Sequence, residues 1–429
     1  MIRKRLYFLK KGLIRNNPFF LKRLRTLQEL ESLPEFIVQG QQSDTFVRLV
    51  HHAYNFSPFY KSFYDSYGVN MKQIQDTTDI KRLPIVSKEM VRDYASSILT
   101  TRSFFCRIAH TSGTSGTPLQ LYRDLRSMVE EEAYIWRHRS RFGHNLGDKS
   151  VSLRGDLDRS TFRVYDPVAK TLHLSNFLLN EKTAERYFKE IAEFKPSAIF
   201  AYPSSMEILA NFLLSKNLYL EVPYVFTSSE TLYDFQRPKI EKVFNTRIVD
   251  WYGNAERTIA LEESEGGEYN EIPTYSVNEY ESDHVISTGL INFSFPLIRY
   301  RVDDIVLPSN RKGKITQIIG KSDDSIILPD GTRVVRLGGP FKGLKEIKYA
   351  QLVQSSHDKL SVNIVPSNEY SQKVISIVKR KLQLRLGTEI ILSFNIINED
   401  DIIKTKRGKF KFVISKLQED SIRERVNIE

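Results

Sequence analysis

Residues 111–118 are the stretch whose residue types point most directly to chemistry. They read Thr-Ser-Gly-Thr-Ser-Gly-Thr-Pro and follow His110. Glycine lets the backbone curl so that successive N–H groups converge on an anion, and the hydroxyl side chains add further donors. The common P-loop ends in Gly-Lys-Ser/Thr, and the lysine of that ending is absent here. The composition predicts a phosphate-binding loop, although a solvated turn can have the same composition.

Four further segments carry the charged side chains that a nucleotide site needs. The carboxylate of Glu256 follows a predicted strand, in the run Tyr-Gly-Asn-Ala-Glu, where it could hold Mg²⁺. The other segments are 288–289 (Thr-Gly) with 299–304 (Arg-Tyr-Arg-Val-Asp-Asp), 320–324 (Gly-Lys-Ser-Asp-Asp) and 404–409 (Lys-Thr-Lys-Arg-Gly-Lys). Taken singly, each is consistent with an exposed carboxylate, a turn or a solvated basic loop. Their order and spacing as a set favour one nucleotide-binding site.

As a set, these motifs resemble the adenylate-forming superfamily of acyl-CoA synthetases. The resemblance is to the branch of phenylacetate–CoA ligases and their relatives in capsular-polysaccharide gene clusters, and it covers about residues 80–415. It implies an α/β fold with a large N-terminal adenylation domain and a small, mobile α+β C-terminal domain. It also implies an AMP-forming ligase that uses ATP and Mg²⁺. Such an enzyme converts a small carboxylic acid to acyl-AMP, releases pyrophosphate and passes the acyl group to a thiol or an amine.

The resemblance assigns roles to individual residues around the nucleotide. The β- and γ-phosphates would be held by the loop residues Thr111, Ser112, Gly113, Thr114, Ser115, Gly116 and Thr117. Adenine would lie against Ser229 and Glu230, and Tyr252 would stack on the base. Asp304 would accept hydrogen bonds from the ribose hydroxyls, and Glu256 would bind Mg²⁺. The remaining nucleotide contacts would come from Gly253 and Lys321.

Other assigned roles concern the reacting carboxylate and the movement between domains. Lys409 corresponds to the C-terminal lysine that contacts the carboxylate and the α-phosphate, and Asp323 corresponds to the hinge. The acyl pocket would be lined in part by Tyr202, Pro203 and Ser204.

The sequence also departs from the family pattern. Leu119 stands where many relatives have lysine, Lys321 replaces the usual arginine, and Asp303 occupies a common glycine position. The cysteines of zinc-bearing relatives are missing. The acceptor therefore stays open between coenzyme A, a carrier-protein thiol and an amine. Two alternatives also stay open: a coenzyme A ligase for an aryl acid of the phenylacetate type, and a nucleotide-binding protein without catalysis.

The elements that must position these residues can be read from hydrophobic periodicity. Helices are predicted over 124–141 and 204–216, and strands over 198–202, 222–227 and 247–251. Strands that alternate with helices indicate a sheet whose ligands gather beyond the carboxyl ends of the strands. After residue 320 the pattern changes, with strands near 325–335, 359–365 and 389–396 and a helix near 370–385. We therefore predict a large domain over 41–322 and a small domain over 323–429.

Length, charge and cysteine content narrow the class of protein. A chain of 429 residues predicts two domains. The net charge is +11, but residues 1–30 hold nine lysines and arginines against one acid, a net +8. The body is thus nearly balanced, which argues against nucleic-acid binding. The single Cys106 excludes an intramolecular disulfide and a multi-thiolate zinc site. With no long apolar run or secretory signal, the sequence predicts a cytoplasmic protein.

The N-terminal segment, residues 1–40, is predicted to form basic amphipathic helices. Apolar side chains recur at helical spacing in two sets, Ile2, Leu6, Leu9 and Leu13, then Phe20, Leu24 and Leu27. Such a segment can dock on an anionic membrane surface, where each basic residue contributes about 1 kcal/mol. It can equally pack on the body of the protein. The sequence leaves both interpretations open, and residues 1–30 could thus bring the enzyme to the inner face of the membrane.

Overall fold

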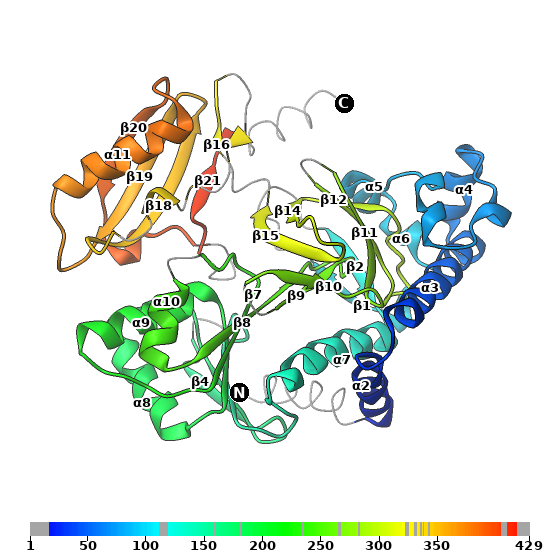
Figure 1. The fold of residues 1–429 in the computed structure, drawn as a ribbon, viewed down its shortest axis with the longest axis horizontal. Helices are drawn as coiled ribbons and strands as arrows, with labels where there is room; N and C mark the ends of the chain where they lie inside the picture. Colours follow the sequence, from blue (N-terminus) through cyan, green and yellow to red (C-terminus); the bar gives the residue numbers. More distant parts are fainter. Residues whose placement is uncertain are drawn as a thin grey trace.

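The computed structural model describes residues 17–110, 119–157, 160–180, 182–233, 236–264, 267–281, 284–321, 326–329, 333–334, 337, 339–341, 344–404 and 410–417. Its centre is a ten-stranded sheet with the order β14-β15-β10-β9-β8-β7-β6-β3-β5-β4 (Figure 1). The strands are β3 Ser150–Leu153, β4 Arg163–Asp166, β5 Thr171–Leu174, β6 Ala198–Ala201, β7 Tyr224–Ser228, β8 Arg247–Gly253, β9 Ala260–Glu263, β10 Tyr269–Glu271, β14 Asp304–Pro308 and β15 Lys314–Lys321. The middle strands β5, β3, β6, β7 and β8 are parallel, so their carboxyl ends share one edge.

The two faces of this sheet are covered by different helices. Ile199, Val225 and Ile248 point to a core that they share with α8 (Ala184–Phe194), α9 (Pro203–Ser215) and α10 (Arg237–Phe244). The alternate residues Phe200 and Phe226 point the other way, toward the end of α7 (Leu125–Arg141), where Trp136 contacts Phe200. Strands buried on both faces between helices are the hallmark of an α/β domain. The predicted fold class and the helices predicted over 124–141 and 204–216 are confirmed.

A second hydrophobic core organises the N-terminal helices around smaller sheets. The helices are α3 Glu35–Phe56, α4 Pro58–Ser66, α5 Lys88–Asp93 and α6 Ala95–Ile98, with short 3₁₀ turns at Met71–Gln73, Thr77–Arg82 and Ser103–Phe105. They pack with the hairpin β1 (Arg107–His110) and β2 (Gln120–Arg123), and with a sheet of β11 (Ser276–Tyr280), β12 (Val285–Gly289) and β13 (Tyr300–Val302). This core holds the segment 299–304 against the edge of the large sheet.

The C-terminal part forms its own four-stranded sheet with the order β20-β19-β18-β21. Its elements are β18 Ile347–Ser356, β19 Lys359–Pro366, β20 Ile391–Ile396, β21 Val413–Ser415 and α11 Lys373–Leu386, with a small hairpin of β16 (Ile326–Ile327) and β17 (Arg333–Val334) and 3₁₀ turns at Gly339–Phe341 and Glu399–Asp401. One face packs on α11. Tyr349, Val365 and Ile402 join the core of the large sheet instead, so this unit docks on α9.

Strand β18 was not predicted, although it is longer than any other strand among the described residues. Two glutamines interrupt its apolar pattern, and both are fully buried. Gln351 and Gln354 bond to backbone groups of neighbouring segments instead of to water. A polar side chain that is buried and satisfied only by tertiary contacts looks like a surface residue in the sequence.

Helix α2 (Pro18–Leu30) packs on α7 in the described structure. Asn17 caps its first turn, and Phe20, Leu24, Leu27 and Leu30 are buried against α7. Of the two interpretations of the N-terminal segment, packing on the body therefore holds for this apolar stripe. The first predicted set, Ile2 to Leu13, lies outside the described residues. Within the part of the chain that is described, no helix combines the length and apolar character needed to cross a membrane.

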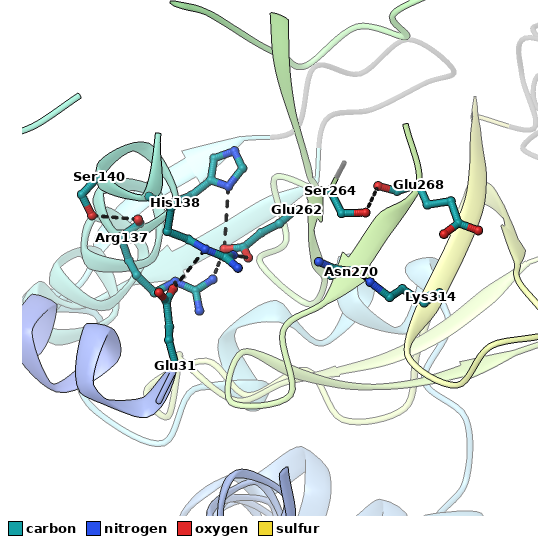
Figure 2. A network of polar contacts seen from close by, with 10 residues as sticks. Glu31, Arg137, His138, Ser140, Glu262, Ser264, Glu268, Asn270 and Lys314 are labelled. Carbon is teal, nitrogen blue, oxygen red and sulfur yellow. Dashed lines mark hydrogen bonds and ion pairs between the residues drawn. The ribbon is translucent and has the colours of Figure 1, made fainter. Parts of the chain in front are cut away.

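A network of ion pairs fixes α2 and α7 to the sheet (Figure 2). Glu262 on β9 pairs with Arg137 and with Arg141, at 2.5 Å for the latter. Glu31, just after α2, lies 3.5 and 3.4 Å from the same two arginines. A cavity of about 330 Å³ opens beside this network. Because the buried Arg137 and the more exposed Arg141 both have carboxylate partners, we interpret the network as structural and not as a ligand site.

Replacing Leu27 with alanine should destabilise the protein by about 2–5 kcal/mol, since the side chain is fully buried between α2 and α7. Urea unfolding followed by tryptophan fluorescence reports on this region, because Trp136 and Trp251 both lie in its core. Leu21→Ala, at a side chain that is 40 % exposed, is the matched control and should change stability by less than about 0.5 kcal/mol. Equal effects of the two variants would contradict the packing of α2.

Candidate active site

The strands of the hairpin β1–β2, which flank the predicted phosphate loop in the sequence, lie beside other predicted site residues. The loop residues Thr111–Thr117 lie outside the described residues, but both flanking strands are described and pair His110 with Gln120. At the other end of β2, the Arg123 guanidinium donates to the carbonyl oxygen of Ala255, next to Glu256. Burial, followed by the nearby Arg257, lowers the pKa of Arg123 to about 10. The hairpin therefore lies against the Tyr252–Glu256 segment.

Two tyrosines connect the Tyr252–Glu256 segment to segment 299–304. The hydroxyl of Tyr252, at the end of β8, donates to Asp304 Oδ2 at 2.6 Å. The hydroxyl of Tyr300 donates to Glu256 Oε1 at 3.3 Å. Burial first, and then the adjacent carboxylate, raises the pKa of each tyrosine well above its ordinary value. Both phenols thus stay protonated and orient the two carboxylates. Gly253, which follows Tyr252 in the chain, is exposed at the end of β8.

A close backbone approach fixes the loop that carries Glu256. Gly289 at the end of β12 lies so near this loop that a Cβ atom there would stand 2.5 Å from the carbonyl oxygen of Arg257. Its neighbour Thr288 accepts a hydrogen bond from the backbone N–H of Arg299 at 2.9 Å. The Arg299 side chain in turn pairs with Glu279 at 2.8 Å. No role was predicted for Thr288 and Gly289. This pair joins the segment that carries Glu256 to segment 299–304.

Glu230 connects three regions that are far apart in the sequence. It follows β7 and the exposed Ser229, whose φ of 71° is a left-handed turn. One carboxylate oxygen accepts the N–H of Ser204 at 3.2 Å, and the other accepts the N–H of Phe410 at 3.1 Å. Ser204 lies in the first turn of α9 after the buried Pro203. The predicted adenine and acyl-pocket residues are therefore neighbours, and the C-terminal unit reaches both.

Further polar side chains surround Tyr202, beyond the carboxyl ends of β3 and β5. The Tyr202 hydroxyl accepts the N–H of Gly155 at 3.3 Å. Asp156 accepts a hydrogen bond from Ser152 at 2.7 Å, and its carboxylate lies 3.3 Å from Nδ1 of His173. Burial raises the pKa of Tyr202, and the carboxylates of Glu230 and Asp156 raise it further. Sequence reasoning missed this polar group because Ser152 and His173 lie within four-residue strands that were not predicted.

Of three predicted residues near the C-terminal unit, the structure describes only the backbone of Lys321. The backbone of Lys321 pairs with Asp304 at the β14–β15 edge. Asp323 and Lys409 lie outside the described residues. The described residues on either side of the undescribed stretch, Lys404 and Phe410, pair with each other. The buried Gln351 amide donates to the carbonyls of Ile403 and Lys411 at 2.9 and 2.8 Å.

The donor set can be tested for Mg²⁺ and for a nucleotide. Among the residues that the structure describes, no group of three metal-ligating side chains occurs. A magnesium ion on nucleotide phosphates needs only one or two protein carboxylates, since phosphates and waters fill the other positions. Glu256, held by the Tyr300 hydroxyl, fits that requirement. A carboxylate such as that of Asp304 can accept hydrogen bonds on both oxygens, which suits hydroxyl donors such as those of a ribose.

The fold is that of the AMP-forming ligases. The chain superposes on 2-hydroxyisobutyryl-CoA ligase in its postadenylation state with a TM-score of 0.69, covering 91 % of this chain and 92 % of that chain at 15 % identity. Sequence comparison leads to the same class. Residues 326–416 match the model of the CapK C-terminal domain.

The chain is a homologue of two named proteins, one of which is a coenzyme A ligase. It is 26 % identical to Protein CapK of Staphylococcus aureus over 423 residues, which cover 93 % of this chain and 92 % of CapK. It is 23 % identical to a phenylacetate-coenzyme A ligase of Thermus thermophilus, over 70 % of this chain and 74 % of that protein. The resemblance to the phenylacetate–CoA ligase and CapK branch of the adenylate-forming superfamily is therefore confirmed.

Gly289→Ala should lower both stability and nucleotide binding, because the new methyl group would displace the backbone of Arg257 beside Glu256. We expect a loss of about 1–3 kcal/mol in stability and weaker AMP binding, measured by thermal unfolding and calorimetry. Gly40→Ala is the control. Gly40 lies inside α3 with open space around it, so alanine there should stabilise by about 0.5–1 kcal/mol. Unchanged AMP binding in Gly289→Ala would contradict the role of this approach.

Proposed function

We propose that this protein activates a small carboxylic acid with ATP and then transfers the acyl group to a thiol or an amine. The main support is the convergence of separate segments at one edge of the sheet. Asp304 and Glu256 are oriented by Tyr252 and Tyr300, while Glu230 brings the segment next to Lys409 to the start of α9. Homology to phenylacetate-coenzyme A ligases adds independent support.

The first step joins the substrate carboxylate to the α-phosphorus of ATP. A carboxylate oxygen forms a bond to that phosphorus, and the bond from phosphorus to the bridging oxygen of pyrophosphate breaks. Two anions must approach, so catalysis depends on positioning and charge stabilisation, and no side-chain nucleophile is required. In this proposal Lys409 offsets charge at the α-phosphate, and Thr111–Thr117 donate to the leaving pyrophosphate. Glu256 would hold Mg²⁺, which supplies further charge neutralisation when bound.

The second step transfers the acyl group from AMP to an acceptor. Rotation of the C-terminal unit about Asp323 would withdraw Lys409 and admit the acceptor. The name of the phenylacetate-coenzyme A ligase supports a coenzyme A thiol, and the aryl acid of that enzyme is one candidate substrate. The relationship to CapK supports an amine or thiol in surface-polysaccharide synthesis instead. A nucleotide-binding protein without catalysis is the second candidate function.

The N-terminal helices could bring the enzyme to an anionic membrane surface, as the sequence suggested. Helix α2 buries its apolar stripe, yet Phe19 and Phe36 are 79 % and 70 % exposed. Lys22 and Arg25 are exposed on the same helix as Phe19. Exposed aromatic side chains beside basic residues suit a membrane interface. Together with the six basic residues before Asn17, they support peripheral binding, where a lipid-linked acceptor would be found.

ATP–pyrophosphate exchange across a panel of carboxylic acids tests the proposed activity. The panel should include hydroxy and amino acids beside aryl acids, because polar side chains surround Tyr202. We expect exchange with at least one acid. Lys409→Ala should lower that exchange at least about a hundredfold, roughly 2.7 kcal/mol of transition-state stabilisation, while ATP binding is retained. A wild-type protein that fails to bind ATP, or normal exchange in Lys409→Ala, would refute the proposal.

Membrane binding can be tested by sedimentation with vesicles of phosphatidylcholine containing 30 % phosphatidylserine. We expect the full chain to sediment with them, less so as salt is raised, because each basic residue near the surface contributes about 1 kcal/mol. Replacing both Phe19 and Phe36 with serine should release the protein without unfolding it, since both side chains are exposed. Equal binding to vesicles of pure phosphatidylcholine, or none to either, would exclude this surface.

A further inference from the structure

We infer that Glu230 is a positioning residue that holds the C-terminal unit in the arrangement for acyl-adenylate formation. The inference rests on the function proposed above and deepens it. By resemblance alone, Glu230 would lie against adenine. Its carboxylate instead accepts two backbone N–H groups from different parts of the protein, Ser204 and Phe410. Both oxygens are thus engaged in contacts between segments.

The large domain presents this carboxylate in a fixed position. Ser229 adopts a left-handed backbone conformation directly before Glu230, which turns the chain sharply at the end of β7. One oxygen then bonds to the N–H of Ser204 in the first turn of α9, a helix of 13 residues. The first turn of a helix leaves N–H groups without intrahelical partners and favours a negative charge. The Glu230 carboxylate is therefore held in place on the large domain.

The C-terminal unit presents an equally fixed partner. Phe410 pairs with Lys404. Gln351 of β18 bonds to Ile403 and to Lys411, next to these two residues. The N–H of Phe410 therefore moves with the C-terminal sheet as a whole. Lys409 is the residue directly before Phe410 in the chain.

Two other contacts between the C-terminal unit and the large domain differ from the bond between Phe410 and Glu230. The rings of Tyr233 and Phe412 lie 5.3 Å apart, and Asn211 donates to the Tyr349 hydroxyl at 3.2 Å. Neither contact involves a residue next to Lys409. The bond from Phe410 to Glu230 must break when the C-terminal unit rotates, because Ser204 keeps the carboxylate on the large domain. Glu230 thereby favours the first half-reaction over the second.

Glu230→Gln tests this inference, because glutamine has nearly the same shape as glutamate. Glutamine offers one oxygen where two N–H donors need two, and its amide N–H₂ would face one of them. In ATP–pyrophosphate exchange with the best acid of the panel, we expect kcat to fall about 10–100-fold and the KM for ATP to change less than about twofold. Capture of preformed acyl-adenylate by hydroxylamine should be unchanged or faster. An effect confined to the KM for ATP would instead assign Glu230 to adenine and overturn the inference.

A measurement without catalysis separates this inference from the proposed function. In hydrogen exchange followed by mass spectrometry, peptides containing Phe410 should exchange at least about tenfold faster in Glu230→Gln than in the wild type. Peptides from α11 should not change, since α11 packs within its own unit. If the wild type shows no pyrophosphate exchange but this difference is present, the docking role stands and the ligase function falls. Equal exchange at Phe410 in both proteins overturns the inference whatever the enzyme does.

Tyr349→Phe is the matched control for a general weakening of the interface. It removes the hydrogen bond from Asn211 but leaves the Glu230 carboxylate in place. We expect adenylation within about threefold of wild type and no faster exchange at Phe410. Equal losses in Tyr349→Phe and Glu230→Gln would mean that any interface contact serves, which contradicts a specific role for Glu230.

Discussion

The parallel alignment of β5, β3, β6, β7 and β8 is the constraint from which the candidate site follows. Because these strands run in one direction, the chain leaves each of them at the same edge of the sheet. Asp156, Tyr202, Glu230 and Tyr252 are separated by up to about a hundred residues in the sequence and still gather there. Helices on both faces bury the strands, and the polar side chains of the candidate site lie at this edge. The parallel strands thus bring together residues that local motifs only name one by one.

Backbone groups, more than side-chain pairs, hold the parts of the site together. Arg123 bonds to a carbonyl beside Glu256, Gly289 lies against the carbonyl of Arg257, and Glu230 receives two N–H groups. Buried polar groups cost free energy unless they are paired, so each such contact is strongly specified. The acidic side chains are therefore oriented by rigid neighbours, as charge stabilisation in catalysis requires.

The ion pairs around Glu262 perform a different task from the acidic residues of the site. Glu262 and Glu31 neutralise two arginines of α7. Helix α2 packs on α7 and so fixes these two arginines, which makes α2 part of the large domain (Figure 2). The cavity there is consequently a product of helix packing around paired charges. The candidate site lies at the strand ends instead.

The sequence by itself determined the class of protein, the helices α7 and α9, and strands such as β6 and β8. Helical and strand periods are local, and motifs such as Tyr252–Glu256 retain their spacing whatever surrounds them. It did not reveal β18, whose buried Gln351 and Gln354 are satisfied only by distant backbone groups. The role of the Thr-Gly pair and the contacts of Glu230 were likewise decided by tertiary structure. Hydrogen bonds between residues far apart in sequence leave no periodic signal, so only the folded chain defines them.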